Sequence, residues 1–326
     1  MQKAVVLEQP GGPENLKWKD SYVAAPGKGE VLLQQKAVGL NYIDVLHRKG
    51  VYPLPYPAII GMEAAGVVEV LGPDCGPDLK VGDRVGYGLG PVGAYAQYRT
   101  IAAEKVVKLP DAVSVELAAA VMLKGLTAHY LVSRVFMVNK NHTILVHAAA
   151  GGVGLLICQF AKVLGARVIG TVGSEEKAAL AKANGCDFPL LYKSEDVAKR
   201  VKEITEGKGV HAVYDGIGKD TYTLSLDCLM RFGILISYGQ ASGPLPPIDP
   251  GELARRGSLF FVSPTLMDYK GETQEYRLSL NEIFQGMEGG LIRVNVGQSY
   301  YLYDAVSAHR DLEAGKTSGS TILVTG

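Results

Sequence analysis

Cysteine is scarce in this chain, and the few cysteines lie far apart. The 326 residues include only Cys75, Cys158, Cys186 and Cys228. The smallest separation, from Cys158 to Cys186, is 28 positions, which excludes a C-x-x-C redox motif and a zinc knuckle. Such sparse use is typical of free thiols in a reducing compartment. We therefore expect a cytoplasmic protein without disulfide bonds.

Net charge and membrane-directed segments are also lacking. Lys and Arg number 33, and Asp and Glu number 33, so no overall basic field attracts nucleic acid or anionic membranes. Four consecutive apolar residues precede Glu8, too few for the core of a signal peptide. The uncharged stretch 141–161 is long enough to cross a bilayer. Its glycines and histidines instead indicate a buried strand, a glycine turn and a buried helix.

Glycine, by contrast, is abundant. The 40 glycines in 326 residues exceed the average share of about 7%, and no three-residue repeat explains them. We expect them at tight turns and close backbone approaches. The length corresponds to about two domains.

The hydrophobic pattern changes along the chain. Up to about residue 110, short apolar or alternating runs lie between Gly, Pro and Asp, as in a β-rich domain; they are 3–7, 30–38, 66–70, 84–87 and 94–101. From Thr143, strand-like runs alternate with helical segments; the strand-like runs are 143–148, 167–172, 188–191, 210–215, 232–238 and 258–262. This alternation predicts an α/β fold with a doubly wound parallel sheet.

The strongest motif is a glycine turn between the first of these strands and its helix. It reads Ala148-Ala149-Ala150-Gly151-Gly152-Val153-Gly154. A pyrophosphate needs backbone N–H groups at the positive end of a helix, and side chains at Gly151 or Gly152 would hold it away. Gly154 allows the helix to pack closely on the strand. The motif predicts a dinucleotide site that includes Ala150 and Val153.

The end of the next strand indicates which dinucleotide binds. An NAD site places an acidic residue there for the ribose 2′-hydroxyl, but this chain has Gly173 and Ser174. Lys177 follows in the first turn of the predicted helix. A small residue, a hydroxyl and a cation suit a 2′-phosphate, although Glu175 and Glu176 weaken the positive field. We expect NADPH rather than NADH.

These motifs carry a family resemblance. Together with Gly61–Gly72, Lys80–Val85 and the segments Gly39–Asp44 and Val213–Asp215, they resemble the zeta-crystallin-like NADPH:quinone oxidoreductases of the medium-chain dehydrogenase/reductase superfamily. The resemblance covers essentially the whole chain. It implies a Rossmann domain, residues 124–292, inserted in a GroES-like β-rich catalytic domain, residues 1–123 completed by 293–326. It also implies a homodimer in which the Rossmann sheets pair.

The chain departs from the zinc-dependent members of this superfamily. Asn41 stands where they carry a cysteine ligand, and Met62 where a histidine precedes the glutamate. Amide and thioether groups are poor ligands for catalytic zinc. No cysteine lies between Gly82 and Pro110, where those enzymes carry a structural zinc lobe. We expect no metal, and hence substrates that accept hydride without a Lewis acid.

The resemblance also implies the remaining site residues. Asn41, Asp44 and Tyr52 line the substrate region near the nicotinamide, with Thr127 as a further polar residue; for Asp44 a helix-capping role is the stronger alternative. Asn41 can donate from its amide. Tyr192 flanks the ribose phosphate, and the backbone around Gly239 and Ser263 approaches the nicotinamide. His147, beside the glycine turn, is interpreted as a strand residue rather than a catalyst.

Together these observations predict an NADPH-dependent reductase of small-molecule quinones. One alternative is an alkenal or enone double-bond reductase, which needs a proton donor for carbon. Another is a non-catalytic NADPH-binding protein of the crystallin-like or RNA-binding kind. The neutral charge and the lack of a basic aromatic stripe argue against RNA.

Overall fold

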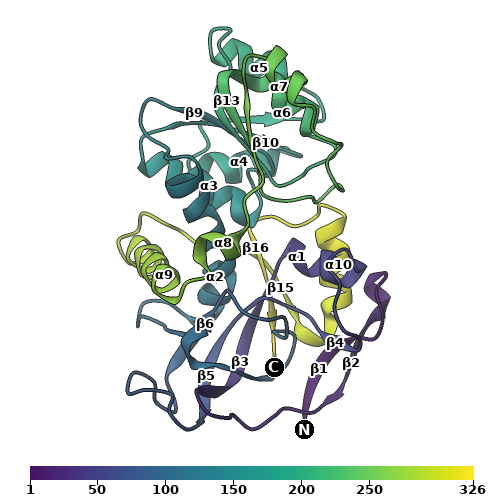
Figure 1. Cartoon of the computed structure of the whole chain (residues 1–326), viewed down its shortest axis with the longest axis vertical. Coiled ribbons are helices and arrows are strands. Elements are labelled where there is room, and N and C mark those ends of the chain that lie inside the picture. Colours follow the sequence, from purple (N-terminus) through teal and green to yellow (C-terminus); the bar gives the residue numbers. More distant parts are fainter. The chain divides into compact units, whose positions relative to one another are not determined.

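The alternating pattern after Thr143 forms one six-stranded parallel sheet in the computed structural model, which describes residues 1–326. Its strands are β9 (Thr143–Val146), β10 (Arg167–Val172), β11 (Phe188–Leu191), β12 (Val210–Asp215), β13 (Leu229–Ser237) and β14 (Phe260–Val262). They lie in the order β11-β10-β9-β12-β13-β14, and every pairing is parallel. Figure 1 labels β9, β10 and β13 of this sheet. The order reverses between β9 and β12, which confirms the predicted doubly wound sheet.

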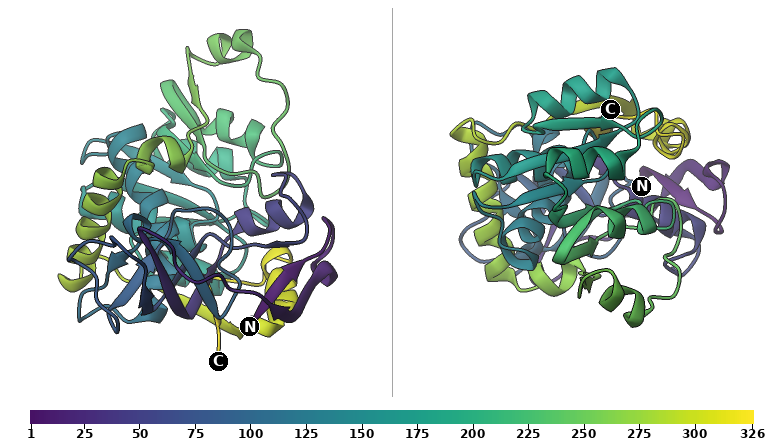
Figure 2. Two further views of the ribbon diagram at one scale, coloured as in Figure 1. Left: turned by 60° about the horizontal axis from the view of Figure 1, so that its bottom comes forward. Right: turned by 90° about the horizontal axis from the view of Figure 1, so that it is seen from above.

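Helices connect these strands and cover the sheet (Figure 2). They are α3 (Gly152–Val163), α4 (Glu175–Ala183), α5 (Val197–Ile204), α6 (Tyr222–Cys228) and α7 (Pro250–Arg255). The short helix α8 (Leu266–Lys270) follows the last strand, β14. Leu145, Ile169 and Val213 are fully buried in the core between sheet and helices. The uncharged stretch 141–161 folds as β9, the glycine turn and most of α3, as the sequence predicts.

The two ends of the chain build the β-rich part together. Its strands are β1 (Gln2–Leu7), β2 (Leu16–Ser21), β3 (Glu30–Leu40), β4 (Ala58–Ile59), β5 (Glu63–Leu71), β6 (Arg84–Tyr87), β7 (Tyr98–Ala102), β8 (Val107–Lys108), β15 (Val296–Tyr301) and β16 (Ser320–Val324). One sheet has the order β2-β1-β4, and the other β15-β16-β3-β5-β6-β8, with β7 also on β3. Because β16 pairs antiparallel with β3, the C-terminal strand completes the sheet, as the resemblance implies.

Four helices accompany these strands. They are α1 (Tyr42–Lys49), α2 (Val115–Tyr130), α9 (Thr273–Glu288) and α10 (Ala305–Glu313). A five-residue π-helical turn extends α2 to Val135, giving a helix of membrane-spanning length and apolarity. Of its apolar window, 72% is buried inside the structure, so it is a core helix of this fold.

The predicted strand 94–101 begins only at Tyr98. The side chain of Gln35 explains the difference, because its amide nitrogen donates to the carbonyl oxygens of Ala94 and Ala96, at 3.0 and 2.6 Å. A side chain therefore takes the hydrogen bonds that a neighbouring strand would otherwise provide.

The chain divides into two units near the predicted domain boundaries. The first contains residues 1–126, 271–290 and 294–326, and the second 127–270 and 291–293. The sequence analysis places 271–290 in the nucleotide-binding domain, whereas the structure places this segment, which carries α9, in the first unit. The hydroxyl of Tyr276 in α9 explains this, because it donates to the carbonyl of Lys105 and accepts from the N–H of Gly88.

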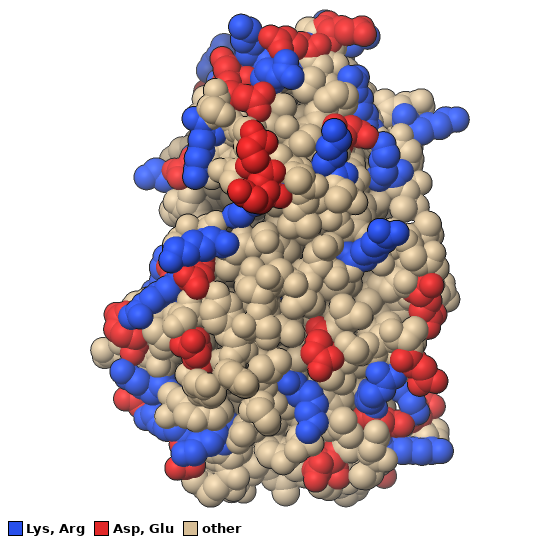
Figure 3. Space-filling view, turned by 180° about the vertical axis from the view of Figure 1, so that it is seen from behind, with Lys and Arg blue, Asp and Glu red and all other residues tan.

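Charged side chains are mixed on the surface. On the face drawn in Figure 3, acidic and basic side chains are interspersed, and no large area has a single sign. This face offers no basic track for a nucleic-acid backbone.

Candidate functional site

In the glycine turn after β9, Gly151 and Gly154 have different roles. Gly151 is the N-cap of α3, with φ −81° and ψ 168°. A Cβ atom on Gly151 would meet only the carbonyl oxygen of Ala148, at 3.2 Å, so this position has one protein neighbour. A Cβ on Gly154 would lie 2.3 Å from the same oxygen. Gly154 is therefore required by helix packing, and Gly151 leaves room for a ligand.

The first turn of α3 has the chemistry of an anion site. The N–H groups of Gly152, Val153 and Gly154 belong to the first turn, where helical N–H groups lack partners within the helix. No acidic residue lies in that turn, so the positive end of the helix dipole is not cancelled. Ala150 is buried in the turn at 4% exposure. These residues fit a pyrophosphate held by backbone donors.

The end of β10 gathers the residues predicted to select the dinucleotide. Gly173 lies under Tyr192, because a Cβ there would be 3.0 Å from the Tyr192 hydroxyl. The Ser174 hydroxyl accepts the N–H of Lys177 at 3.3 Å and so caps α4. Burial, and then the ammonium of Lys193, lower the pKa of Lys177. Lys177 and Lys193 are therefore close enough for their charges to influence one another.

Lys193 is a residue that the sequence analysis missed. It directly follows Tyr192, so the signal available in the sequence was its position just after β11, the strand next to β10.

Ser174 also has a second partner, since its hydrogen bond to Glu176 lowers the pKa of that carboxyl.

The remaining predicted cofactor residues lie at the same carboxyl edge of the sheet. Gly239 follows β13, and a Cβ there would lie 2.8 Å from the carbonyl oxygen of Gly216. Ser263 follows β14. In doubly wound sheets, ligands bind at this edge beside the point where the strand order reverses. The residues predicted to bind the cofactor thus lie at one edge of the parallel sheet, where its strands end.

A buried hydrogen-bond chain supports this edge. The Ser225 hydroxyl donates to Asp215 Oδ2 at 2.7 Å, so its oxygen accepts the Nε2–H of His147 at 3.0 Å. His147 Nδ1 then accepts from the Thr171 hydroxyl at 2.9 Å. Asp215 also accepts the N–H groups of Ile217 and Gly218. His147 is a structural residue that links β9 and β10 with the loop after β12.

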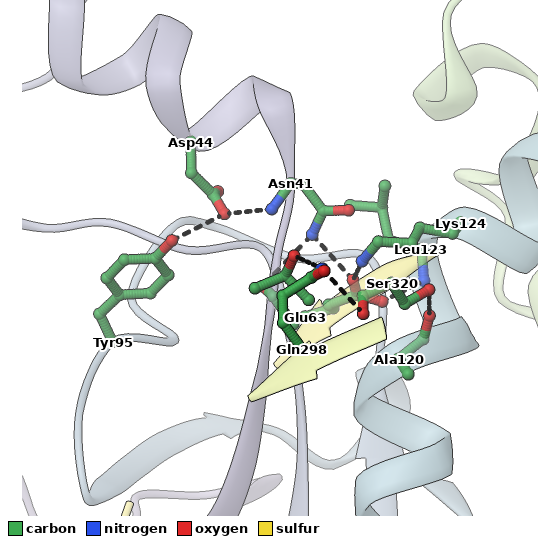
Figure 4. Close-up of polar contacts among 11 residues, drawn as sticks. Asn41, Asp44, Glu63, Tyr95, Ala120, Leu123, Lys124, Gln298 and Ser320 are labelled. Atoms are coloured by element: carbon green, nitrogen blue, oxygen red, sulfur yellow. Dashed lines mark hydrogen bonds and ion pairs between the residues drawn. The ribbon is translucent and has the colours of Figure 1, made fainter. Parts of the chain in front are cut away.

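In the first unit, Asn41 and Asp44 lie together at the junction of β3 and α1 (Figure 4). The backbone N–H of Asn41 donates to Asp44 Oδ2 at 3.0 Å, an interaction that caps α1. Asn41 is 6% exposed and Asp44 is fully buried. The capping role anticipated for Asp44 is therefore present.

The side chain of Asn41 does not have the donor capacity that the sequence analysis expects. Its Nδ2 group donates to Glu63 Oε1 at 2.8 Å and to the carbonyl oxygen of Gly39 at 3.3 Å. Both partners are acceptors only, so they fix the orientation of the amide. Both amide hydrogens are engaged, and a substrate oxygen finds no donor on Asn41.

Asp44 stands at one end of a directed hydrogen-bond chain. Arg48 Nη1 lies 3.3 Å from His309 Nδ1, and because arginine only donates, Nδ1 must accept. His309 Nε2–H therefore donates to the Tyr95 hydroxyl at 3.0 Å. Tyr95 in turn donates to Asp44 Oδ2 at 3.1 Å. Arg48, His309 and Tyr95 are not among the site residues predicted from the sequence.

Burial shifts the pKa values of two groups in this hydrogen-bond chain, Asp44 and His309. It raises the pKa of Asp44 to about 7, against the hydrogen bonds from Asn41 and Tyr95. Burial also lowers the pKa of His309 to about 3, and the charge of Arg48 adds to that effect. Asp44 Oδ1 has no hydrogen-bond partner. His309 is neutral at physiological pH.

The other two predicted catalytic residues are less constrained. Tyr52 follows α1, is 42% exposed, and its ring lies edge-on to His47 with centroids 5.8 Å apart. Thr127 lies in α2 at 8% exposure and begins the second unit. The surroundings of Tyr52 and Thr127 do not by themselves indicate a chemical role for either residue.

No group of three or more His, Cys, Asp or Glu side chains gathers as a metal-binding cluster. Met62, at one of the positions that bear zinc ligands in the zinc-dependent relatives, is buried at 9% exposure.

Known proteins are similar to this chain in both of its units. Models of the alcohol dehydrogenase GroES-like domain and of zinc-binding dehydrogenases match residues 27–111 and 152–280. A quinone oxidoreductase of Pseudomonas aeruginosa is 46% identical, covering 99% of this chain and 100% of that protein. A 2-haloacrylate reductase of a Burkholderia species is 42% identical, with 99% of each chain covered. The crystal structure of Escherichia coli quinone oxidoreductase complexed with NADPH matches with a TM-score of 0.96 and 42% identity, covering 99% of this chain and 100% of that chain.

Proposed function

The chain belongs to the quinone oxidoreductases of the medium-chain dehydrogenase/reductase superfamily, and from this premise we propose that it reduces small-molecule quinones with NADPH and without a metal. It is an NADPH-dependent oxidoreductase. The observation that carries the proposal is the pairing of the glycine turn with Lys177 and Lys193. Together they match a pyrophosphate and a 2′-phosphate.

Each part of the second unit has a task in this proposal. The N–H groups of the first turn of α3 bind the pyrophosphate. Lys177 and Lys193 bind the 2′-phosphate through charge-assisted hydrogen bonds. NADPH, when bound, supplies a hydride from C4 of the nicotinamide.

The first unit supplies the substrate-facing residues. Asn41 is fixed in orientation, because its amide donates to Glu63 and Gly39 and its side chain accepts the backbone N–H of Asp44 in the cap of α1. Asp44 holds the start of α1 in place. The Tyr52 hydroxyl orients the acceptor by donating one hydrogen bond. A quinone accepts hydride without a Lewis acid, so no metal is needed. Stoichiometric zinc in the purified enzyme, lost together with activity on chelation, would contradict the metal-free mechanism.

Steady-state oxidation of NADPH in the presence of 1,4-benzoquinone tests the proposed activity. We expect turnover with NADPH to exceed turnover with NADH when both are assayed below saturation. Tight NADPH binding without turnover, across a panel of quinones and enones, would instead identify a non-catalytic NADPH-binding protein.

Lys177→Ala should raise the NADPH dissociation constant by about one to two decades, because a charge-assisted hydrogen bond contributes roughly 1.5–3 kcal/mol. The NADH dissociation constant should barely change. Fluorescence titration with both cofactors measures the effect, and Lys182→Ala, in the last turn of the same helix, is the control. Equal losses for both cofactors would show that Lys177 supports the fold and not the phosphate.

The similarity to a 2-haloacrylate reductase favours a second candidate, reduction of a conjugated carbon–carbon double bond. Such a substrate requires a proton on carbon, whereas a quinone oxygen takes its proton from water. Tyr52 is exposed enough to reach a substrate. A variant of Tyr52 therefore tests whether the enzyme itself supplies the proton.

Tyr52→Phe should slow quinone reduction by no more than about tenfold, since one neutral hydrogen bond contributes about 0.5–1.5 kcal/mol. If Tyr52 is the proton donor of an enone reductase, the loss should reach about 10²–10⁴. The measurement is kcat with both substrate classes, together with NADPH affinity. A loss beyond a hundredfold with NADPH affinity intact would favour the double-bond reductase.

We also place the enzyme in the cytoplasm and propose a homodimer formed through the parallel sheet. β14 is the edge strand of that sheet, and Phe260 on it is 59% exposed. Edge strands present unpaired N–H and C=O groups to a second chain. Sedimentation equilibrium of wild-type enzyme and of Phe260→Lys tests this interface.

A further inference from the structure

A buried lysine lies beside Asn41. Lys124 of α2 is 5% exposed, and its ammonium binds Glu63 Oε1. The same oxygen accepts the Asn41 amide at 2.8 Å. The ammonium and the Asn41 amide therefore meet on one carboxylate oxygen, as Figure 4 shows.

Glu63 is built into the fold as an acceptor. It is fully buried, and besides Lys124 and Asn41 its Oε2 accepts the backbone N–H of Leu123 at 2.7 Å. The backbone also leaves space for it, because a Cβ on Gly39 would lie 2.2 Å from Glu63 Oε1. Three donors therefore hold this carboxylate in place. Glu63 is thus a fixed counterion rather than a group free to bind substrate.

Lys124 retains donors that its neighbours lack. An ammonium has three N–H donors, and one of them binds Glu63. No residue of the chain accepts the other two. Asn41 has none left, since its amide hydrogens bind Glu63 and Gly39. A buried ammonium with unmade hydrogen bonds is costly, and a ligand oxygen can supply the missing acceptor.

We propose that Lys124 donates a hydrogen bond to the substrate oxygen that becomes negatively charged, with Glu63 as its fixed counterion. This inference rests on the proposed reduction reaction and identifies its electrophile. NADPH gives a hydride, two electrons and one proton, to the quinone and becomes NADP⁺. The resulting oxyanion takes its second proton from water and forms the hydroquinone. Lys124 keeps its protons throughout and stabilises the anion only electrostatically.

The decisive variant removes both charges. Lys124→Met alone leaves Glu63 buried without its counterion and is expected to destabilise the fold. Glu63→Gln/Lys124→Met is neutral and nearly isosteric, so it should fold and bind NADPH within about threefold of wild type. Its kcat with benzoquinone should fall by about 10²–10³, the usual loss when an oxyanion donor is removed. The control is Asp83→Asn/Lys108→Met, which neutralises a more exposed pair of the same unit and should leave kcat unchanged.

A second readout does not depend on turnover. With saturating NADP⁺, 4-nitrophenol serves as a probe for an anionic substrate oxygen, because its absorbance reports its ionisation. In wild type, the bound phenol should ionise about one pH unit or more below the free phenol, since a nearby cation favours the anion. In the neutral double variant this shift should disappear.

The outcomes separate the inference from the proposed function. A double variant with kcat within threefold of wild type, or with an unchanged nitrophenol shift, would overturn the role of Lys124. A wild-type enzyme that reduces no quinone but shows a Lys124-dependent nitrophenol shift would overturn the quinone proposal and leave the inference standing.

Discussion

Arg48→Met should lower the free energy of unfolding of the first unit by about 3–5 kcal/mol, because it removes a fully buried charge from its partners. Arg48 is 0% exposed, and its Nη2 lies 2.7 Å from Glu313 Oε2. Its Nε donates to the carbonyl oxygen of Gly11 at 3.1 Å, and Nη1 to His309. The variant leaves the buried His309 Nδ1 and the partly buried Gly11 carbonyl without this donor, and Glu313 with Lys49 alone.

Lys49→Met is the matched control, because Lys49 binds the other oxygen of the same carboxylate at 2.7 Å. Its side chain is 45% exposed, and exposed ion pairs contribute only about 0–1 kcal/mol. Guanidinium unfolding followed by near-ultraviolet circular dichroism measures both variants. Equal and small losses would show that Arg48 is not a structural centre of the first unit.

The second large effect is a pair of opposite pH dependences. Asp44→Asn should make stability rise with pH relative to wild type between pH 4 and 6.5. His309→Gln should make it fall with pH over the same range. Each slope should be about 1.4 kcal/mol per pH unit, the value for one proton.

The signs follow from which state binds the proton. The pKa of Asp44 is raised to about 7 from 3.8, so between these values the folded state binds a proton that the unfolded state has lost. Its contribution is complete below pH 3.8 and is lost as pH rises toward 7. The pKa of His309 is lowered to about 3 from 6.5, so its contribution is lost as pH falls from 6.5. In wild type the two slopes cancel.

Unfolding free energies at several pH values, measured for each variant and for Asp44→Asn/His309→Gln, check this cancellation. In the double variant, the unfolding free energy should again depend on pH as in wild type, because both titrating groups with opposite slopes are absent. Single variants whose curves run parallel to wild type would show that neither group changes its ionisation on folding.

The nucleotide-binding half was predictable because its signals are local in sequence. The glycine turn lies within seven residues, and Gly173, Ser174 and Lys177 lie within five. Each acts where its own strand ends, so periodicity and one motif suffice to place it. The carboxyl edge of a parallel sheet then brings the separate strand ends together.

The polar cluster of the first unit was predictable only in part. Asn41 and Asp44 are three residues apart and appear as one motif. Glu63 lies 22 positions from Asn41, and His309 lies 261 positions from Arg48. Such pairs are created by strand register and helix packing, which a single sequence does not encode locally. For the same reason, the sequence does not reveal that Glu63 and Gly39 occupy both amide hydrogens of Asn41.

The pairing of β16 with β3 has a consequence for synthesis on the ribosome. The sheet that carries Asn41 receives its β16 neighbour from residues 320–324, which are synthesised after the second unit. All of the second unit, residues 127–270 and 291–293, is made before that point. The nucleotide-binding unit can therefore fold first during translation, whereas the β-rich unit cannot complete its sheet until β16 has been made, with one edge of β3 uncovered in the meantime. A chaperone that binds nascent chains should accordingly protect β3 rather than the parallel sheet.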